Sequence, residues 1–131
     1  MLENRKKRER KASLMVPLPL GLLKVERALL ITPGSDTLSI KDTTVEVYED
    51  VHSRRLLRGR GFVHNMSMVD MLEKDETFDI ILDFGDDIFF FLKKPMIQVG
   101  KVFDKKVLST IHFSIGENVR ELPPEAAKPY F

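Results

Sequence analysis

The chain contains no cysteine and no tryptophan. Without cysteine it can form neither a disulfide framework nor a thiolate zinc site, and it fits a reducing compartment. It also lacks an apolar run of the roughly 20 residues that span a bilayer, because Pro17 and Pro19 interrupt the stretch after the basic N-terminus. These prolines, and the absence of a small-residue cleavage site near Lys24, argue against a secretory signal. We therefore expect a soluble, cytoplasmic protein.

The chain is long enough, and contains enough apolar residues, to form one hydrophobic core. Of its 131 residues, 43% are hydrophobic and 31% are charged, which is typical of a globular domain rather than a disordered chain. Nine phenylalanines supply the aromatic bulk. We expect a single domain at 14–122, preceded by a basic arm at 1–13 and followed by an extended, proline-rich tail at 123–131.

Charge is distributed unevenly along the chain, although the net charge is only +1. Residues 1–11 carry six basic and two acidic side chains, and residues 52–60 carry four arginines and no acid. The rest of the chain is therefore acidic. Two cationic patches on an acidic body favour a localised anionic partner over general coating of nucleic acid.

Short apolar segments between turn signals predict an all-β fold. Residues 77–84 alternate most clearly between apolar and polar positions, and Gly85-Asp86 then predicts a tight hairpin. Further strands are expected at 22–32, 38–40, 43–51, 61–67, 88–92, 96–103 and 107–114. A turn or one helical turn is expected near Met66–Leu72, and a short helix is expected at 117–122. The pattern predicts a small antiparallel β-barrel of about six to eight short strands, with a short C-terminal helix or turn.

The most specific stretch runs from Arg54 to Asp70. Its arginines can bind phosphates or a guanine by bidentate hydrogen bonds and by stacking, or they can form a solvated loop. An Asn-x-Ser turn follows, whose side chains can bond nearby backbone or present polar atoms to a ligand. The candidate ligand-binding residues are Arg54, Arg55, Arg58, Arg60, Asn65, Ser67 and Asp70.

Signals for catalysis or metal binding are weak. Asp83-Phe84-Gly85 matches a kinase triplet, but the chain has no glycine-rich or catalytic-loop motif. Asp86 and Asp87 lack the alternating spacing of a calcium loop. The three histidines form no metal-binding pair, and no nucleophile elbow or P-loop occurs. We expect a protein that is not an enzyme and has no resident cofactor.

Several of these residues together resemble a PilZ domain. The matching segments are GFVHNMSMVDM from Gly61, then FDIILDF and KPMIQVGKV. That family is a small β-barrel that binds cyclic di-GMP through RxxxR and (D/N)xSxxG motifs. Asn65 and Ser67 match the second motif, whereas Asp70 stands at its glycine position. Arg54 and Arg58 have the RxxxR spacing but lie unusually close to Asn65.

The resemblance implies a regulatory binding module for cyclic di-GMP or, where the site has degenerated, for a protein partner. The alternative is a small structural or assembly protein, matrix-like or capsid-like. Its basic arm would contact nucleic acid or an anionic membrane, and its extended tails would suit a homo-oligomer.

Overall fold

The computed structural model describes residues 16–74, 77–100 and 108–131. The predicted basic arm at 1–13 and the turn between the last predicted strand pair lie outside these ranges. The nine strands in the described ranges are β1 Gly21–Lys24, β2 Arg27–Ile31, β3 Thr37–Glu49, β4 Arg55–His64, β5 Asp79–Asp83, β6 Phe89–Leu92, β7 Met96–Val99, β8 Leu108–Ile115 and β9 Val119–Leu122. The helical elements are α2 Asn65–Lys74, α3 Pro124–Ala127 and the 3-10 turn η1 Lys128–Tyr130.

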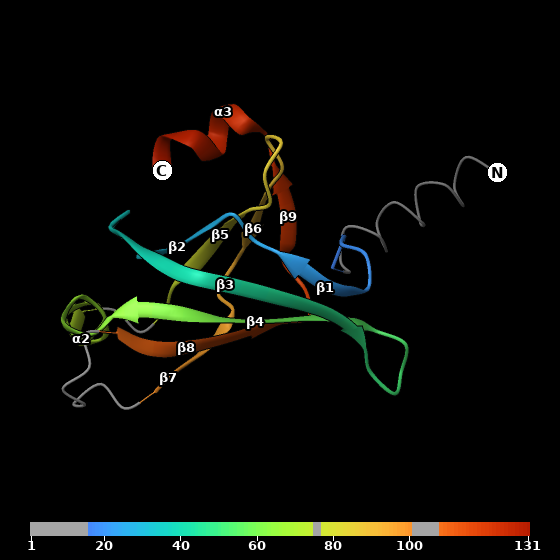
Figure 1. Ribbon diagram of the computed structural model, residues 1–131, viewed down its shortest axis with the longest axis horizontal. Helices are drawn as coiled ribbons and strands as arrows, with labels where there is room; N and C mark the ends of the chain where they lie inside the picture. Colours follow the sequence, from blue (N-terminus) through green and yellow to red (C-terminus); the bar gives the residue numbers. More distant parts are fainter. Residues whose placement is uncertain (1–15, 75–76, 101–107) are drawn as a thin grey trace.

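The strands form one antiparallel sheet in the order β7-β8-β4-β3-β2-β5-β6-β9, with β1 also paired to β3 (Figure 1). This confirms the predicted antiparallel β fold with a short C-terminal helix. The path ends at β7 and β9 in the described part of the chain, so the sheet is not closed and "barrel" is an approximation.

Strand β3 divides the sheet into two halves. Its first residues pair with β2, and its later residues pair with β1 and β4. Between the two parts, pairing with β4 skips from Lys41 to Thr44, and Asp42 has a φ of 50°. The Thr43 hydroxyl donates a 3.0 Å hydrogen bond to the carbonyl of Ile40 inside this bulge. The sequence predicts two short strands here, whereas the structure has one strand with a β-bulge, which bends a strand without ending it.

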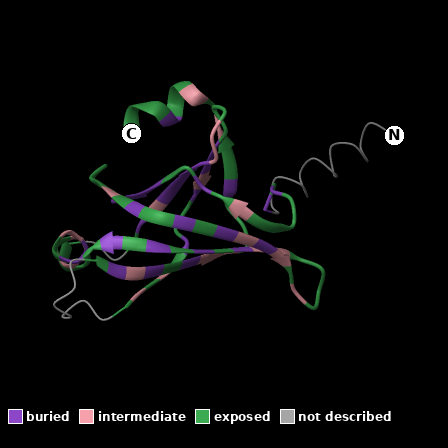
Figure 2. Cartoon of the chain, viewed as in Figure 1, coloured by how far each residue is buried: buried purple, intermediate pink, exposed green. Residues whose placement is uncertain are grey.

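The main core lies between the two halves. Side chains alternate between buried and exposed along β3, β4 and β8, as Figure 2 shows. The fully buried members with large side chains include Leu30, Leu57, Ile80, Leu82, Leu92, Ile111 and Phe113. We refer below to β1, β3, β4, β8 and β7 as sheet A, and to β2, β5, β6 and β9 as sheet B.

Strands β2, β5 and β6 of sheet B are buried on both faces, which explains why they are nearly continuously apolar. On the face away from the main core, a second cluster contains Leu29, Ile31, Ile81 and Phe89. The C-terminal segment from Pro124 covers this cluster with the buried side chain of Ala127 and with Phe131. The predicted extended tail is therefore wrong: Pro124 occupies the first turn of α3, where a proline needs no N–H partner.

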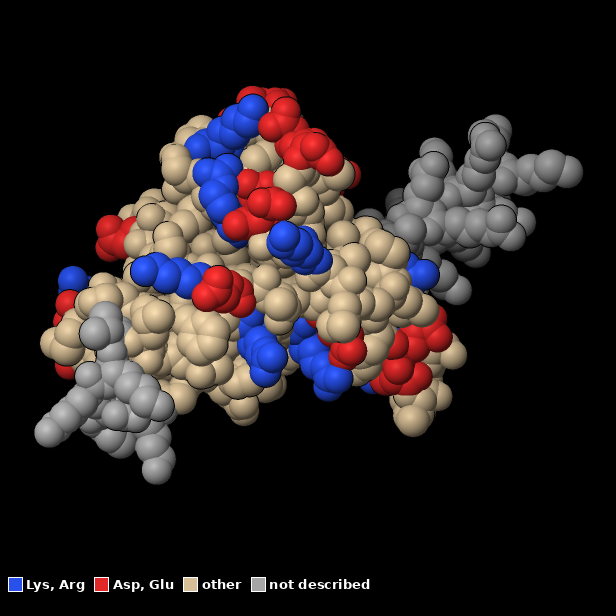
Figure 3. Space-filling model, in the orientation of Figure 1, with Lys and Arg blue, Asp and Glu red and all other residues tan. Residues whose placement is uncertain are grey.

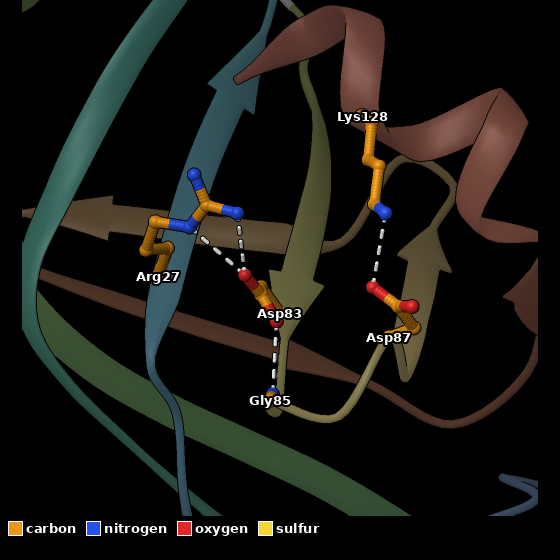
Figure 4. Close-up of polar contacts among 5 residues, drawn as sticks. All are labelled: Arg27, Asp83, Gly85, Asp87 and Lys128. Carbon is orange, nitrogen blue, oxygen red and sulfur yellow. Dashed lines mark hydrogen bonds and ion pairs between the residues drawn. The ribbon is translucent and has the colours of Figure 1, made fainter.

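Polar contacts hold the C-terminal segment in place (Figure 4). Arg27 Nε and Nη2 both lie 2.8 Å from Asp83 Oδ2, and the Arg27 guanidinium lies 4.3 Å from the ring centroid of Phe131. Asp83 Oδ1 also accepts a 2.8 Å bond from the Gly85 N–H. Lys128 Nζ lies 3.2 Å from Asp87 Oδ1. The acidic β5–β6 turn thus contacts the C-terminal segment.

Four other sequence expectations differ from the structure. Residues 22–32 form two strands, β1 and β2, which are interrupted at Val25 and Glu26; both pair with β3, and β2 also pairs with β5. Strand β4 begins at Arg55, not Gly61, and ends at His64, where α2 replaces the end of the strand predicted to Ser67. The helical turn expected near Met66–Leu72 is thus a ten-residue helix. The helix predicted at 117–122 is the edge strand β9, because Val119 enters the core while its backbone pairs with β6.

No helix in the described ranges is long and apolar enough to cross a membrane.

Candidate functional site

The four arginines of the predicted anion site do not lie in one loop. Arg54 precedes β4 in the β3–β4 hairpin, and the other three belong to β4 itself. Each arginine has different surroundings, so their availability to a ligand must be judged one by one.

Arg54 belongs to the structure of the hairpin. Its Nε lies 2.9 Å from Asp50 Oδ2, while Asp50 Oδ1 accepts bonds from the backbone N–H groups of His52 at 2.8 Å and Arg54 at 3.0 Å. The bond from the Arg54 backbone N–H, together with the His52 N–H and the Arg54 guanidinium, holds the pKa of the Asp50 carboxyl below its ordinary value. The contacts of Arg54 with Asp50 therefore stabilise the β3–β4 turn.

Arg55 and Arg58 also have partners within the chain. Arg55 Nη1 donates a 2.9 Å hydrogen bond to the carbonyl of Leu18, which fixes the segment before β1. Arg58 Nε and Nη2 lie 2.7 and 2.5 Å from Glu46 Oε1 on the neighbouring strand. The Arg58 guanidinium also lies 4.8 Å from the ring centroid of Tyr48. A ligand would have to compete with these contacts.

Arg60 is different. It is exposed on the outer face of β4, and its side chain makes no hydrogen bond or ion pair with any residue that the structure describes. Its guanidinium retains its donors for an anion such as a phosphate.

The Asn65–Ser67 turn of the PilZ-like motif is the start of α2. Asn65 is only 5% exposed, and its Oδ1 accepts a hydrogen bond from Ser109 Oγ on β8. Ser67 Oγ lies 3.3 Å from His64 Nδ1, which also accepts a 3.5 Å bond from the Ser67 backbone N–H at the helix start. Asp70 is exposed farther along α2. Asn65 therefore has a structural role, which leaves no polar group of that side chain on the surface.

The first and last residues of the predicted site lie at opposite ends of β4 (Figure 1), and Arg58 and Arg60 lie between them. Ten residues of strand at about 3.3 Å each separate the hairpin of Arg54 from Asn65 by about 30 Å. The structure therefore does not bring Arg54 and Arg55 together with Asn65, Ser67 and Asp70.

The pairing register instead places Arg60 in a row that crosses all five strands of sheet A. We call it the Arg60 row, and its members from β1 to β7 are Lys24, Thr44, Arg60, His112 and Gln98. None of the five is acidic. The adjacent row contains Leu22, Glu46, Arg58, Ser114 and Met96. Its charges cancel in the Glu46–Arg58 pair.

The adjacent row and the Arg60 row without Lys24 line a shallow depression of about 640 Å³ on the outer face of sheet A. Leu22 and Met96 are 79% and 69% exposed at its two edges, which is unusual for large apolar side chains. Thr44, Gln98 and His112 supply hydrogen-bonding groups on either side of Arg60. The depression thus combines apolar rims with a positively charged, polar centre, a common arrangement in ligand sites.

The face of the molecule drawn in Figure 3 does not carry charge of one sign over a broad area. In Figure 3, Lys and Arg side chains are interspersed with Asp and Glu side chains over the visible face. Among the described residues of sheet A, Lys24 and Arg60 are local groups that can attract an anion, because neither has a side-chain partner in the described ranges.

Sequence reasoning missed Lys24, Thr44, His112 and Gln98. Each occupies an outward position of an alternating segment, and this signal is readable in the sequence. Their position beside Arg60 depends on the register between strands that are far apart in the chain, for which a single sequence gives no signal.

The other groups of polar side chains give weaker evidence for a functional site. Asp87 is paired with Lys128, and no group of three acidic or histidine side chains in the described ranges is arranged to hold a metal ion. The contact between Ser67 and His64 is explained by capping of α2, since His64 Nδ1 accepts the Ser67 backbone N–H.

Comparison of the chain with protein-family models, with curated proteins and with solved structures finds no match.

Proposed function

We propose that this chain is a non-enzymatic binding module that holds a phosphate-bearing ligand on the Arg60 row. The observation that carries the proposal is an exposed arginine without a side-chain partner in the described ranges, in a depression of about 640 Å³ with no acid in its own row. A guanidinium binds phosphate oxygens in a bidentate manner, and Thr44 and His112 lie on the strands at either side to complete the contacts.

Cyclic di-GMP is the first ligand to test, because the resemblance to PilZ domains implies it. The proposal moves its site from the Arg54–Asp70 stretch as a whole to Arg60 and the residues in register with it. We also propose a cytoplasmic location, which the absence of cysteine permits. The assembly-protein alternative depends on the basic arm, and no contact in the described ranges favours it.

The test is a titration of the full chain with cyclic di-GMP and with inorganic tripolyphosphate, followed by calorimetry and by backbone amide chemical shifts. Binding of either compound should shift the amides of Thr44, Arg60 and His112 more than those of Asn65 and Ser67. Arg60→Gln should weaken the affinity about tenfold or more, the usual magnitude for loss of a charged hydrogen bond.

Arg120→Gln is the matched control, because it removes the same charge from an exposed arginine on β9 in sheet B. It should leave the affinity unchanged. The proposal would be contradicted by an absence of binding for both compounds, or by equal losses in the two variants.

A further inference from the structure

Among the strands that the structure describes, none extends sheet A beyond either end of the Arg60 row. Strand β1 pairs only with β3, and β7 only with β8, in the described part of the chain. Four strand spacings of about 4.8 Å make the row about 19 Å long. A ligand longer than the row can therefore continue past both edges of sheet A, whereas a closed pocket would limit its length.

An exposed aromatic ring lies next to the row. Phe62 is 39% exposed and is two residues from Arg60 on the same face of β4. Its neighbours across the strands are Lys41 on β3 and Thr110 on β8. Tyr48, farther along β3, is covered by Arg58. Phe62 therefore offers a partly exposed aromatic ring near the guanidinium of Arg60.

The charges near Phe62 and Arg60 favour a polyanion. Lys24 and Arg60 are exposed cations of the Arg60 row, and Lys41, opposite Phe62 on β3, is also exposed. The carboxylates nearest in register are Glu46, which is paired with Arg58, and Asp42, which stands in the bulge of β3. Three separate cations spread over the outer face of sheet A match a chain of phosphates better than one compact anion.

From these observations we infer that the ligand of the Arg60 row is a single-stranded nucleic acid lying across sheet A. This inference rests on the proposed function. The phosphates would contact Lys24, Lys41 and Arg60, and one unpaired base would stack on Phe62. Proteins that bind single-stranded nucleic acid without sequence preference combine a positively charged groove with aromatic side chains on which the bases stack. A duplex keeps its bases stacked on each other, so it cannot use Phe62.

The test measures fluorescence anisotropy of labelled oligothymidylates of 4, 8 and 12 nucleotides, and of a duplex, with the full chain at several salt concentrations. Affinity should rise with oligonucleotide length until the row is filled and should exceed that for the duplex. Three phosphate contacts predict a slope of log affinity against log salt of about −2. Arg60→Gln and Lys24→Gln should each make that slope less steep by about 0.7 to 1.

Phe62→Ala should weaken binding on the order of tenfold without changing the salt slope, because stacking releases no counterion. Tyr130→Ala is its matched control, since Tyr130 is an equally exposed ring, also at 39%, next to sheet B. Arg120→Gln is the control for charge. Both control variants should bind as the unchanged protein does, and circular dichroism should show all variants folded.

The inference would be overturned by an absence of oligonucleotide binding or by equal affinity for the duplex. It would also be overturned by a salt slope that Arg60→Gln and Lys24→Gln leave unchanged. That third result would place the nucleic acid elsewhere on the chain, for example on residues 1–13. Tripolyphosphate or cyclic di-GMP binding that depends on Arg60, without a length effect for oligonucleotides, would reject this inference and leave the proposed function intact. Absence of Arg60-dependent binding for every phosphate compound would reject both.

Discussion

Gly59 lets β4 lie against the ring of Phe113 on the core side of sheet A. A Cβ at this position would stand 2.2 Å from Phe113 Cζ, and Phe113 is only 2% exposed. Overpacking of this kind usually costs about 1–3 kcal/mol. Gly59→Ala should therefore lower the free energy of unfolding by about 2–3 kcal/mol, measured by urea denaturation.

Gly34→Ala is the control for this prediction. The atom nearest to its added Cβ is 3.9 Å away, at Thr32 Oγ1, so its effect should stay within about 0.5 kcal/mol. In a Phe113→Leu background the cost of Gly59→Ala should fall, because the ring that causes the overlap is gone. An equal cost in both backgrounds would show that the strain does not come from Phe113.

Gly59 and Gly61 also explain why the sequence does not predict the first half of strand β4. Arginine side chains and two glycines within Arg54–Gly61 suggest a loop, since glycine is depleted in strands. In the structure, Gly59 and Gly61 point inward, where close packing leaves no room for a side chain, and Arg58 and Arg60 point outward. The alternation is present in the sequence, but its inward positions are glycines instead of large apolar residues.

At the scale of the element, the β3–β4 hairpin depends on the ionised form of Asp50. Its carboxylate accepts hydrogen bonds from the backbone N–H groups of His52 and Arg54, which hold its pKa in the folded chain below the ordinary value of 3.8. Because the folded pKa is the lower one, the stabilisation is complete above the unfolded pKa and is lost as the pH falls through the folded pKa. Carboxyl NMR titration should therefore give a midpoint below 3.8 for Asp50.

The amide shifts of His52 and Arg54 should titrate with the same midpoint. In Asp50→Asn these amides should no longer titrate there, while the amides of sheet B should be unaffected. A midpoint for Asp50 at or above 3.8 would contradict the role given to the two backbone N–H groups.

The elements that the sequence predicts incorrectly share a physical cause. Asn65–Lys74 contains methionine, leucine, glutamate and lysine, which favour helix, but Gly61–His64 before it is a clear strand pattern. The boundary depends on the Asn65–Ser109 contact with β8, which is 44 residues away in the chain. The β9 strand likewise depends on its pairing with β6, since four residues carry too weak a pattern to identify it.

At the scale of the whole molecule, the sequence predicts the fold class but not the arrangement of its surfaces. Apolar runs in β2, β5 and β6 indicate buried strands, whereas the segment that covers their second face is a proline-containing stretch that reads as a tail. The sequence does not predict the Arg60 row either, because the row forms only when β8 pairs with β4 and β7 pairs with β8. Binding residues in a sheet of this kind are set by topology, and topology is the least local feature of the chain.

The C-terminal segment can be tested as the cover of sheet B. Ala127 is fully buried against the second cluster, whereas its neighbour Ala126 is exposed. Ala127→Glu would bury a charge without a partner, so the segment from Pro124 should detach and uncover Leu29, Ile31 and Phe89. We expect dye binding to apolar surface, concentration-dependent association in sedimentation experiments, and a loss of stability of about 2 kcal/mol or more. Ala126→Glu makes the same chemical change one residue earlier and should have none of these effects. If both variants stay monomeric with unchanged stability, the segment is not needed to cover sheet B, and the second cluster must tolerate exposure to water.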